Sequence, residues 1–189
     1  MAEELSRPRR EIERAVAAGD LRWLLARAGE LHGHYCPGLA LGVRAAWRTA
    51  RELGVSSTGM EEVVAVVETN SCFSDGVQLV TGCTFGKGNL IFRDYGKHVY
   101  TFLLRPSGRS VRLSARPRPR EVAELDRDER IRRMLAMTDE ELFDIRQGVM
   151  ELPPKAEIHE SVRCERCGEG VMSTRTRIVA VSYTHLRAH

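Results

Sequence analysis

Two histidines and a cysteine alternate in the stretch HGHYCPG, where single residues separate His32, His34 and Cys36. If this stretch is extended, its alternate side chains point to the same side of the backbone. Imidazole and thiolate together suit Zn²⁺ or another transition metal of intermediate softness. The same residue types also build cysteine nucleophiles that have a histidine base. The spacing therefore leaves a metal site and a catalytic Cys36 as alternatives.

A second cysteine lies in a comparable polar context. Cys72 follows an apolar run at residues 62–69, within the stretch NSCFSDG. Loops that leave the ends of strands often carry functional side chains, and the asparagine, serines and aspartate around Cys72 could orient a ligand or hydrogen-bond a thiolate. We therefore expect Cys72 to join Cys36 and the histidines, as a metal ligand or as a second catalytic thiol.

The chain has 189 residues and five cysteines, and its charged N-terminus lacks the apolar stretch of a signal peptide. An odd number of cysteines without a secretion signal argues against a disulfide framework and for the cytoplasm. No apolar run approaches the roughly 20 residues that cross a bilayer, so no membrane association is expected. Cys83, which belongs to none of these motifs, is interpreted as a small residue of the core.

The stretch CERCG near the C-terminus places Cys164 and Cys167 at the spacing of a zinc knuckle, which is half of a tetrahedral site. Two alternatives exist for the other half. His185 and His189 could complete it, or the authentic C-terminus has been lost. The tail VSYTHLRAH differs in character from the residues before it and resembles translated sequencing-adapter DNA. Residues 181–189 are therefore interpreted as foreign, and the second knuckle as missing.

Hydrophobic periodicity indicates the elements that must position these residues. Helical patterns extend over 9–31, where Asp20 could instead begin a second helix, and over 38–53. A further helix capped by Ser74 or Asp75 is expected to end near Thr81, and helical periodicity continues through Ile131, Leu142 and Ile145. A buried strand at 62–69 and two or three antiparallel strands within 89–115 complete the expected elements.

These elements predict an α+β fold, in which helices flank a small and mainly antiparallel sheet. The expected core domain spans residues 1–152, and a partial zinc-binding domain spans residues 153–180. That second domain is expected to be an incomplete appendage of zinc-ribbon or treble-clef type, and such modules depend on the metal for folding.

The stretches HGHYCPGLALGVRAA, ETNSCFSDGVQLVTGCTFGKGNLIFRDYGKHVYTF and CERCGE resemble the family of the E-type subunit of formylmethanofuran dehydrogenase, over about residues 28–172. The resemblance implies an α+β core, a small zinc domain and a homodimer. It also implies that His34, Cys36 and Cys72 meet in a core cleft as a metal or active site. The family name comes from association with a molybdenum or tungsten enzyme that fixes carbon dioxide onto methanofuran, although many members look like stand-alone proteins whose reaction is unassigned.

Three functions are therefore open. The first is a metal-binding protein, and with it a metal-dependent enzyme, in which zinc or another transition metal keeps an open position for water or substrate. The second is an accessory or regulatory module for a molybdenum or tungsten redox enzyme such as formylmethanofuran dehydrogenase. The third is a cysteine–histidine nucleophilic enzyme without metal. Nucleic acid is not an expected partner, because the net charge is only +3 and the arginines have acidic neighbours without interleaved aromatic residues.

Overall fold

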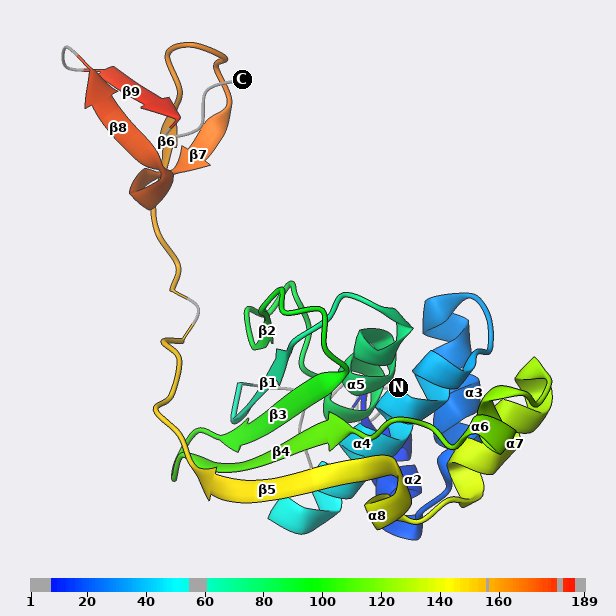
Figure 1. The fold of residues 1–189 in the computed structure, drawn as a ribbon. Coiled ribbons are helices and arrows are strands. Elements are labelled where there is room, and N and C mark those ends of the chain that lie inside the picture. The colour runs from blue at the N-terminus through cyan, green and yellow to red at the C-terminus, as the bar shows by residue number, and fades with distance from the viewer. Residues whose placement is uncertain (1–7, 55–60, 156, 180–181, 186–189) are drawn as a thin grey trace. The chain divides into compact units, whose positions relative to one another are not determined.

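The structure is a computed structural model that describes residues 8–54, 61–155, 157–179 and 182–185. The chain divides into two compact units, Met1–Lys155 and Ala156–His189. The first unit is an α+β domain in which helices pack against a five-stranded sheet (Figure 1). It holds His32, His34 and three of the five cysteines, Cys36, Cys72 and Cys83.

The sheet has the strand order β2-β1-β3-β4-β5, and every neighbouring pair except β1–β2 is antiparallel. The mainly antiparallel α+β fold is therefore confirmed. One detail differs from the expectation for residues 89–115, because β2 pairs parallel to β1 after a helical crossover. The strands are β1 (Val63–Val67), β2 (Leu90–Phe92), β3 (Val99–Leu104), β4 (Arg109–Ala115) and β5 (Phe143–Val149).

Two helices replace the single helical pattern at the N-terminus. Asp20 accepts a hydrogen bond from the Trp23 backbone N–H at 3.0 Å, so it caps the second of these helices, as one of the two interpretations predicted. Among the described residues, the helices of the first unit are α2 (Arg10–Ala18), α3 (Leu21–His32), α4 (Pro37–Leu53), α5 (Cys72–Thr81), α6 (Arg120–Ala123), α7 (Arg127–Ala136) and α8 (Asp139–Leu142).

The helical periodicity predicted through Ile145 is wrong beyond Leu142. Thr138 and Glu141 form a capping box, but the helix that it opens, α8, ends at Leu142. The next residues form β5, in which Phe143 pairs with Ala115 and Ile145 with Leu113. The spacing of Phe143 and Ile145 is compatible with an alternating strand as well as with the apolar face of a helix. Pairing with β4 therefore determines that these residues form a strand.

The core lies between the sheet and the helices. Strand β1 is buried along its whole length, as its β-branched sequence predicts. The side chains of Val63, Ala65 and Val67 join the main core with the helices, whereas Val64 and Val66 form a small cluster with Leu103 on the other face of the sheet. Helices α4 and α5, which carry Cys36 and Cys72 at their N-terminal ends, are thereby held against a buried strand.

The second unit consists of short β-hairpins. One two-stranded sheet pairs β6 (Ser161–Arg163) with β7 (Gly170–Met172), and another pairs β8 (Thr176–Val179) with β9 (Ser182–His185). Among the residues that the structure describes, no helix of either unit has the length and apolar character that crossing a membrane requires.

Candidate metal centre

The stretch HGHYC is a helix end followed by a turn, so the condition of an extended stretch is not met. His32 is the last residue of α3, and Gly33 adopts a left-handed conformation with φ 87° that L side chains rarely accept. The Gly33 backbone N–H donates to the Gly29 carbonyl at 2.7 Å. This turn brings the His34 ring to 4.4 Å from the His32 ring, between centroids. The two imidazoles therefore meet by reversal of the chain, not by strand alternation.

Cys36 begins the next helix. Its extended conformation, with φ −148° and ψ 161°, is the one that Pro37 enforces on the residue before it. The backbone N–H of Leu39 donates to Cys36 Sγ at 3.4 Å, so the thiol is the N-cap of α4. The positive end of the helix dipole and this hydrogen bond both stabilise a thiolate at that position.

Cys72 is the first residue of α5, and the loop position predicted for it is wrong. Ser71 occupies the N-cap position, so the prediction that Ser74 or Asp75 caps this helix is also wrong. Ser74 instead donates its hydroxyl to the Thr69 carbonyl at 2.7 Å, and Asp75 lies within the first turn. Cys36 and Cys72 therefore share the same electrostatic setting at the start of two helices.

A close contact between α4 and α5 sets the separation of the two thiols. A Cβ atom added to Gly42 would lie 2.0 Å from the Phe73 carbonyl oxygen, and one added to Gly76 would lie 2.6 Å from the Val43 backbone nitrogen. Only glycine at both positions allows this approach. Near the helix starts, Gly38 leaves space for the Cys72 side chain, whose Cβ would lie 3.3 Å from a Cβ at Gly38.

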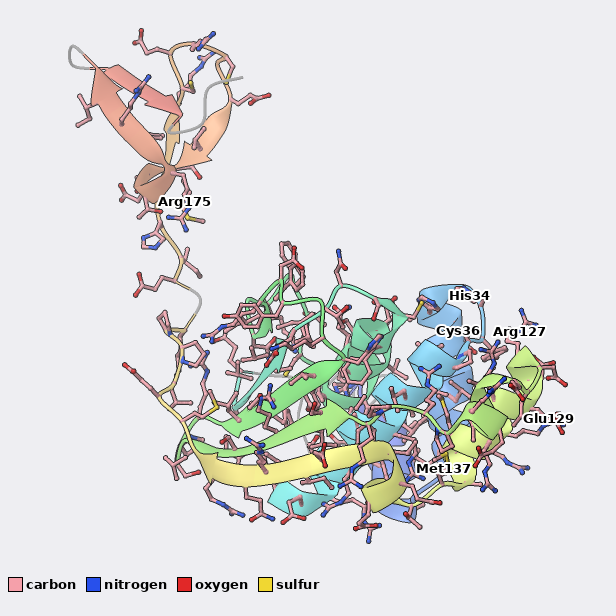
Figure 2. The ribbon with its side chains drawn as sticks, viewed as in Figure 1. His34, Cys36, Arg127, Glu129, Met137 and Arg175 are labelled. Carbon is pink, nitrogen blue, oxygen red and sulfur yellow. The ribbon has the colours of Figure 1, made fainter. Side chains whose placement is uncertain are left out.

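The result is a cluster of four donor groups. One ligand atom from each of His32, His34, Cys36 and Cys72 lies within 4.8 Å of each of the others. His34 is exposed and the other three are half-buried, so the cluster opens to solvent on the His34 side. Figure 2 shows His34 beside Cys36 at this edge of the first unit. The structure thus brings together all four core residues that the sequence suggested.

Asp75 orients one of the imidazoles. His32 Nδ1 lies 2.7 Å from Asp75 Oδ2, and the Gln78 amide donates to Asp75 Oδ1 at 3.1 Å. When Nδ1 carries the proton of this hydrogen bond, His32 Nε2 offers a lone pair. Nε2 is buried and has no hydrogen-bond partner among the described residues. A carboxylate behind one nitrogen and a bare second nitrogen are the arrangement found at metal-bound histidines.

The sequence placed Asp75 near the site without identifying this role. Its three-residue spacing from Cys72 would have indicated that both lie on one face, had Cys72 been assigned to a helix. The partnership of Asp75 with His32 depends on how α3 and α5 pack, which local pattern does not reveal.

The two thiols also influence each other. Burial raises the pKa of Cys72, and the hydrogen bond and charge of Cys36 raise it further. Two thiolates at this distance repel, and a divalent cation between them would remove that cost. The donor set of two imidazoles and two thiols is therefore chemically suited to a transition metal of the zinc type.

The two cysteines of the predicted zinc knuckle lie at a tight turn of the second unit. The Cys164 backbone N–H donates to the Glu169 carbonyl at 2.9 Å, and Gly168, at φ 75°, closes the turn. Cys164 is buried, whereas Cys167 is exposed. Among the described side chains, no third histidine, cysteine or carboxylate completes a metal cluster with this pair. The side chain of His185 lies outside the described part of the chain. Residues 180–181 and 186–189, which include His189, also lie outside it.

Cys83 belongs to the core, as the sequence predicted. It is fully buried within the main core, and burial raises its pKa to about 11. The half-buried Lys87 donates to the Gly82 carbonyl at the C-terminal end of α5.

Comparison with known proteins gives three findings. A family model described as "FmdE, Molybdenum formylmethanofuran dehydrogenase operon" matches residues 31–144. A curated relative from Archaeoglobus fulgidus, "Probable S-adenosyl-L-methionine-binding protein", is 35% identical over 196 residues, which cover 88% of this chain and 53% of the relative. This chain thus spans about half the length of that relative.

The third finding concerns the fold. The crystal structure of an FmdE-like protein from Syntrophus aciditrophicus, named for tungsten formylmethanofuran dehydrogenase, matches with a TM-score of 0.64 at 20% identity, covering 82% of this chain and 86% of that one. The matched family segment, residues 31–144 of 189, contains the whole cluster of His32, His34, Cys36 and Cys72. With more than half of its length matched and a shared fold, the chain belongs to the FmdE family.

Proposed function

We propose that this protein binds one divalent transition metal, with zinc as the first candidate, through His32, His34, Cys36 and Cys72. The single observation that carries the proposal is the convergence of these four donors within 4.8 Å, with His32 Nε2 buried and unpartnered among the described residues. Two imidazoles and two thiolates form a neutral tetrahedral set around a divalent ion, which is a preferred arrangement for Zn²⁺.

The unequal burial of the donors bears on what the metal could do. His32 is held by Asp75, and the two cysteines stand at helix starts, whereas His34 is exposed on a turn without such support. We infer that His34 is the exchangeable ligand, which can yield its position to water or substrate. A zinc site with three firm ligands lowers the pKa of bound water and polarises carbonyl groups. This supports a metal-dependent enzyme over a purely structural site.

The test must separate the core cluster from the knuckle, so the full chain carries Cys164→Ser and Cys167→Ser. After loading with zinc and dialysis, elemental analysis should find one zinc per chain. Adding Cys36→Ser or Cys72→Ser should abolish stoichiometric zinc, whereas the control Cys83→Ala, which removes a thiol of the core, should retain it. Thermal unfolding confirms that each variant is folded. Full zinc occupancy in both the Cys36→Ser and Cys72→Ser variants would overturn the proposal.

The same samples address the cysteine–histidine nucleophile, which uses the same side chains. A metal-free nucleophile would leave the parent protein without stoichiometric metal and would make one thiol react with iodoacetamide much faster than free cysteine. Slow alkylation in the zinc-loaded protein, accelerated by a chelator, supports ligation.

The relative from Archaeoglobus fulgidus supports a second candidate function, which is binding of S-adenosylmethionine. The observation in its favour is the 35% identity over 88% of this chain, together with a cavity of about 430 Å³ beside the segment that leads to Cys72. Equilibrium dialysis of the full chain against labelled S-adenosylmethionine tests it, with and without zinc. Saturable binding supports this candidate, and its absence at millimolar ligand contradicts it.

A further inference from the structure

A cavity of about 430 Å³ lies where the ends of β3 and β4 meet α4, α7 and the proline-rich connector at residues 116–119. Its walls are mostly apolar and include two methionines of the α7 region. Such a concave apolar site with a few polar groups is the usual form of a small-molecule pocket. The larger apolar lining residues are Leu41, Val99, Val122, Met134, Met137 and Leu142.

The charged groups of this pocket are predominantly basic, and most have partners. Arg116 pairs with Asp144 at 2.6 Å. The one acid among the lining residues, Glu141, accepts from the Thr138 backbone N–H at 2.7 Å as part of the capping box, so it is already engaged. In contrast, Arg118 has no hydrogen bond or ion pair within the described part of the chain.

The charged group that acts on Arg118 is itself basic. Partial burial and the nearby charge of Arg130 lower the pKa of Arg118, and burial and the charge of Arg118 lower the pKa of His98. The Nε atom of Arg130 is buried and finds no hydrogen-bond partner among the described residues. Gathering like charges costs free energy that a bound anion would recover. Guanidinium groups also match the geometry of carboxylates and phosphates.

His98 connects this pocket with the candidate metal centre. Its Nε2 lies 3.3 Å from Ser71 Oγ, and its ring meets the Phe73 ring edge-on at 6.0 Å between centroids. Ser71 and Phe73 are the chain neighbours of Cys72. A molecule in the pocket would therefore lie against His98, which in turn contacts the residues that flank one of the proposed ligands.

We propose that this pocket binds a small organic molecule that carries an oxyanion, a carboxylate or a phosphate, on an apolar body. Arg118 receives the oxyanion, and the apolar wall around Met134 and Met137 receives the body. The binding does not require the metal, so it stands apart from the proposed metal function. Because the pocket lies beside His98, such a molecule is a candidate substrate for the metal centre, and this last step rests on the proposed metal function.

Calorimetry on the metal-free full chain tests the inference with three probes of matched length. Hexanoate and hexyl phosphate carry the two oxyanions, and hexanamide is the neutral control. At least one of the two anions should bind saturably and about tenfold or more tightly than hexanamide, since a charge-assisted hydrogen bond is lost in the amide. The anion that binds more tightly identifies the headgroup. Equal affinity for hexanamide, or no saturable binding of either anion, would overturn the inference.

Two substitutions locate the binding. Arg118→Gln should weaken the anion about tenfold or more, and Arg118→Lys should restore part of the affinity, because lysine keeps the charge without the planar fork. The matched control is Arg120→Gln, which removes an exposed arginine that pairs with Glu124 at 2.8 Å outside the pocket lining. Unchanged affinity in Arg118→Gln contradicts the assignment. Because the first titration uses metal-free protein, its result does not depend on the metal proposal. Repeating it with zinc-loaded protein shows whether bound zinc changes the affinity for the anion.

Discussion

At the scale of single residues, the pairing of His32 with Asp75 distinguishes a prepared ligand from an incidental histidine. The 2.7 Å contact holds the ring and directs the proton to Nδ1, so that Nε2 can bind a cation. Cys36 and Cys72 are positioned in another way, because each stands at the N-terminal end of a helix.

Asp75→Asn should weaken zinc affinity by about 10–100-fold, because the amide orients His32 less firmly and adds no negative charge behind it. Competition with a chromophoric chelator measures the affinity in the Cys164→Ser, Cys167→Ser background. Asp94→Asn, which changes an exposed aspartate on the chain between β2 and β3, is the control and should have no effect. Equal affinity for Asp75→Asn and parent protein would contradict the role given to Asp75.

Cys83 should behave as a thiol of the core. Burial raises its pKa to about 11, so at pH 8 the folded protein holds it protonated and shielded from iodoacetamide. The thiolate fraction would grow only as pH approaches that value. Mass spectrometry should find Cys167, which is exposed, modified in the folded protein, and Cys83 modified only in denaturant. Modification of both at similar rates at pH 8 would contradict this placement.

At the scale of elements, the crossing of α4 and α5 brings the two thiols together. Gly76→Ala should destabilise the protein by about 1–3 kcal/mol and weaken zinc binding, because the new Cβ would lie 2.6–2.7 Å from backbone atoms of Val43 and Leu39. The control Gly86→Ala places its Cβ in open space. Chemical denaturation and zinc competition measure the two effects. A Gly76→Ala variant with unchanged stability and zinc affinity would show that this contact does not determine the site.

The ion pair of Arg44 and Asp139 joins α4 to α8. Arg44 is 6% exposed and donates to Asp139 at 2.7 Å and to the Leu135 carbonyl at 2.9 Å. Asp139→Ala leaves this guanidinium buried without its counter-charge, so the free energy of unfolding should fall by about 3 kcal/mol.

Asp144→Ala is the matched control for that substitution. It breaks the exposed pair with Arg116, which should cost less than about 1 kcal/mol. Urea denaturation of both variants compares the two costs. Similar losses of unfolding free energy in Asp139→Ala and Asp144→Ala would contradict the prediction that burial of Arg44 makes its ion pair more costly to break.

Local sequence chemistry predicted the parts of the site that depend on local forces. The buried strand at 62–69, which precedes Cys72, follows from its β-branched run. Cys72 at a helix start and the strand at Phe143–Val149 were not predicted. The first depends on the fit of α5 against Gly42, and the second depends on pairing with β4. Such tertiary contacts leave no local signature.

At the scale of the whole molecule, the fold brings Cys72 to three donors that already lie close together in the sequence. All four belong to the first compact unit, Met1–Lys155, so the candidate centre does not depend on the second unit for any ligand. The homodimer, the association with a molybdenum or tungsten enzyme and the zinc knuckle at Cys164 and Cys167 stay predictions.

X-ray absorption spectroscopy of the zinc-loaded Cys164→Ser, Cys167→Ser protein tests the central claim most directly, because the only cysteines left are those of the first unit. We predict two sulfur neighbours at about 2.3 Å and two nitrogen neighbours at about 2.0–2.1 Å, or one nitrogen and one oxygen if water replaces His34. Cys36→Ser and Cys72→Ser should each remove one sulfur neighbour from any zinc that remains. A coordination shell without sulfur, or a protein that retains no zinc, would contradict the account.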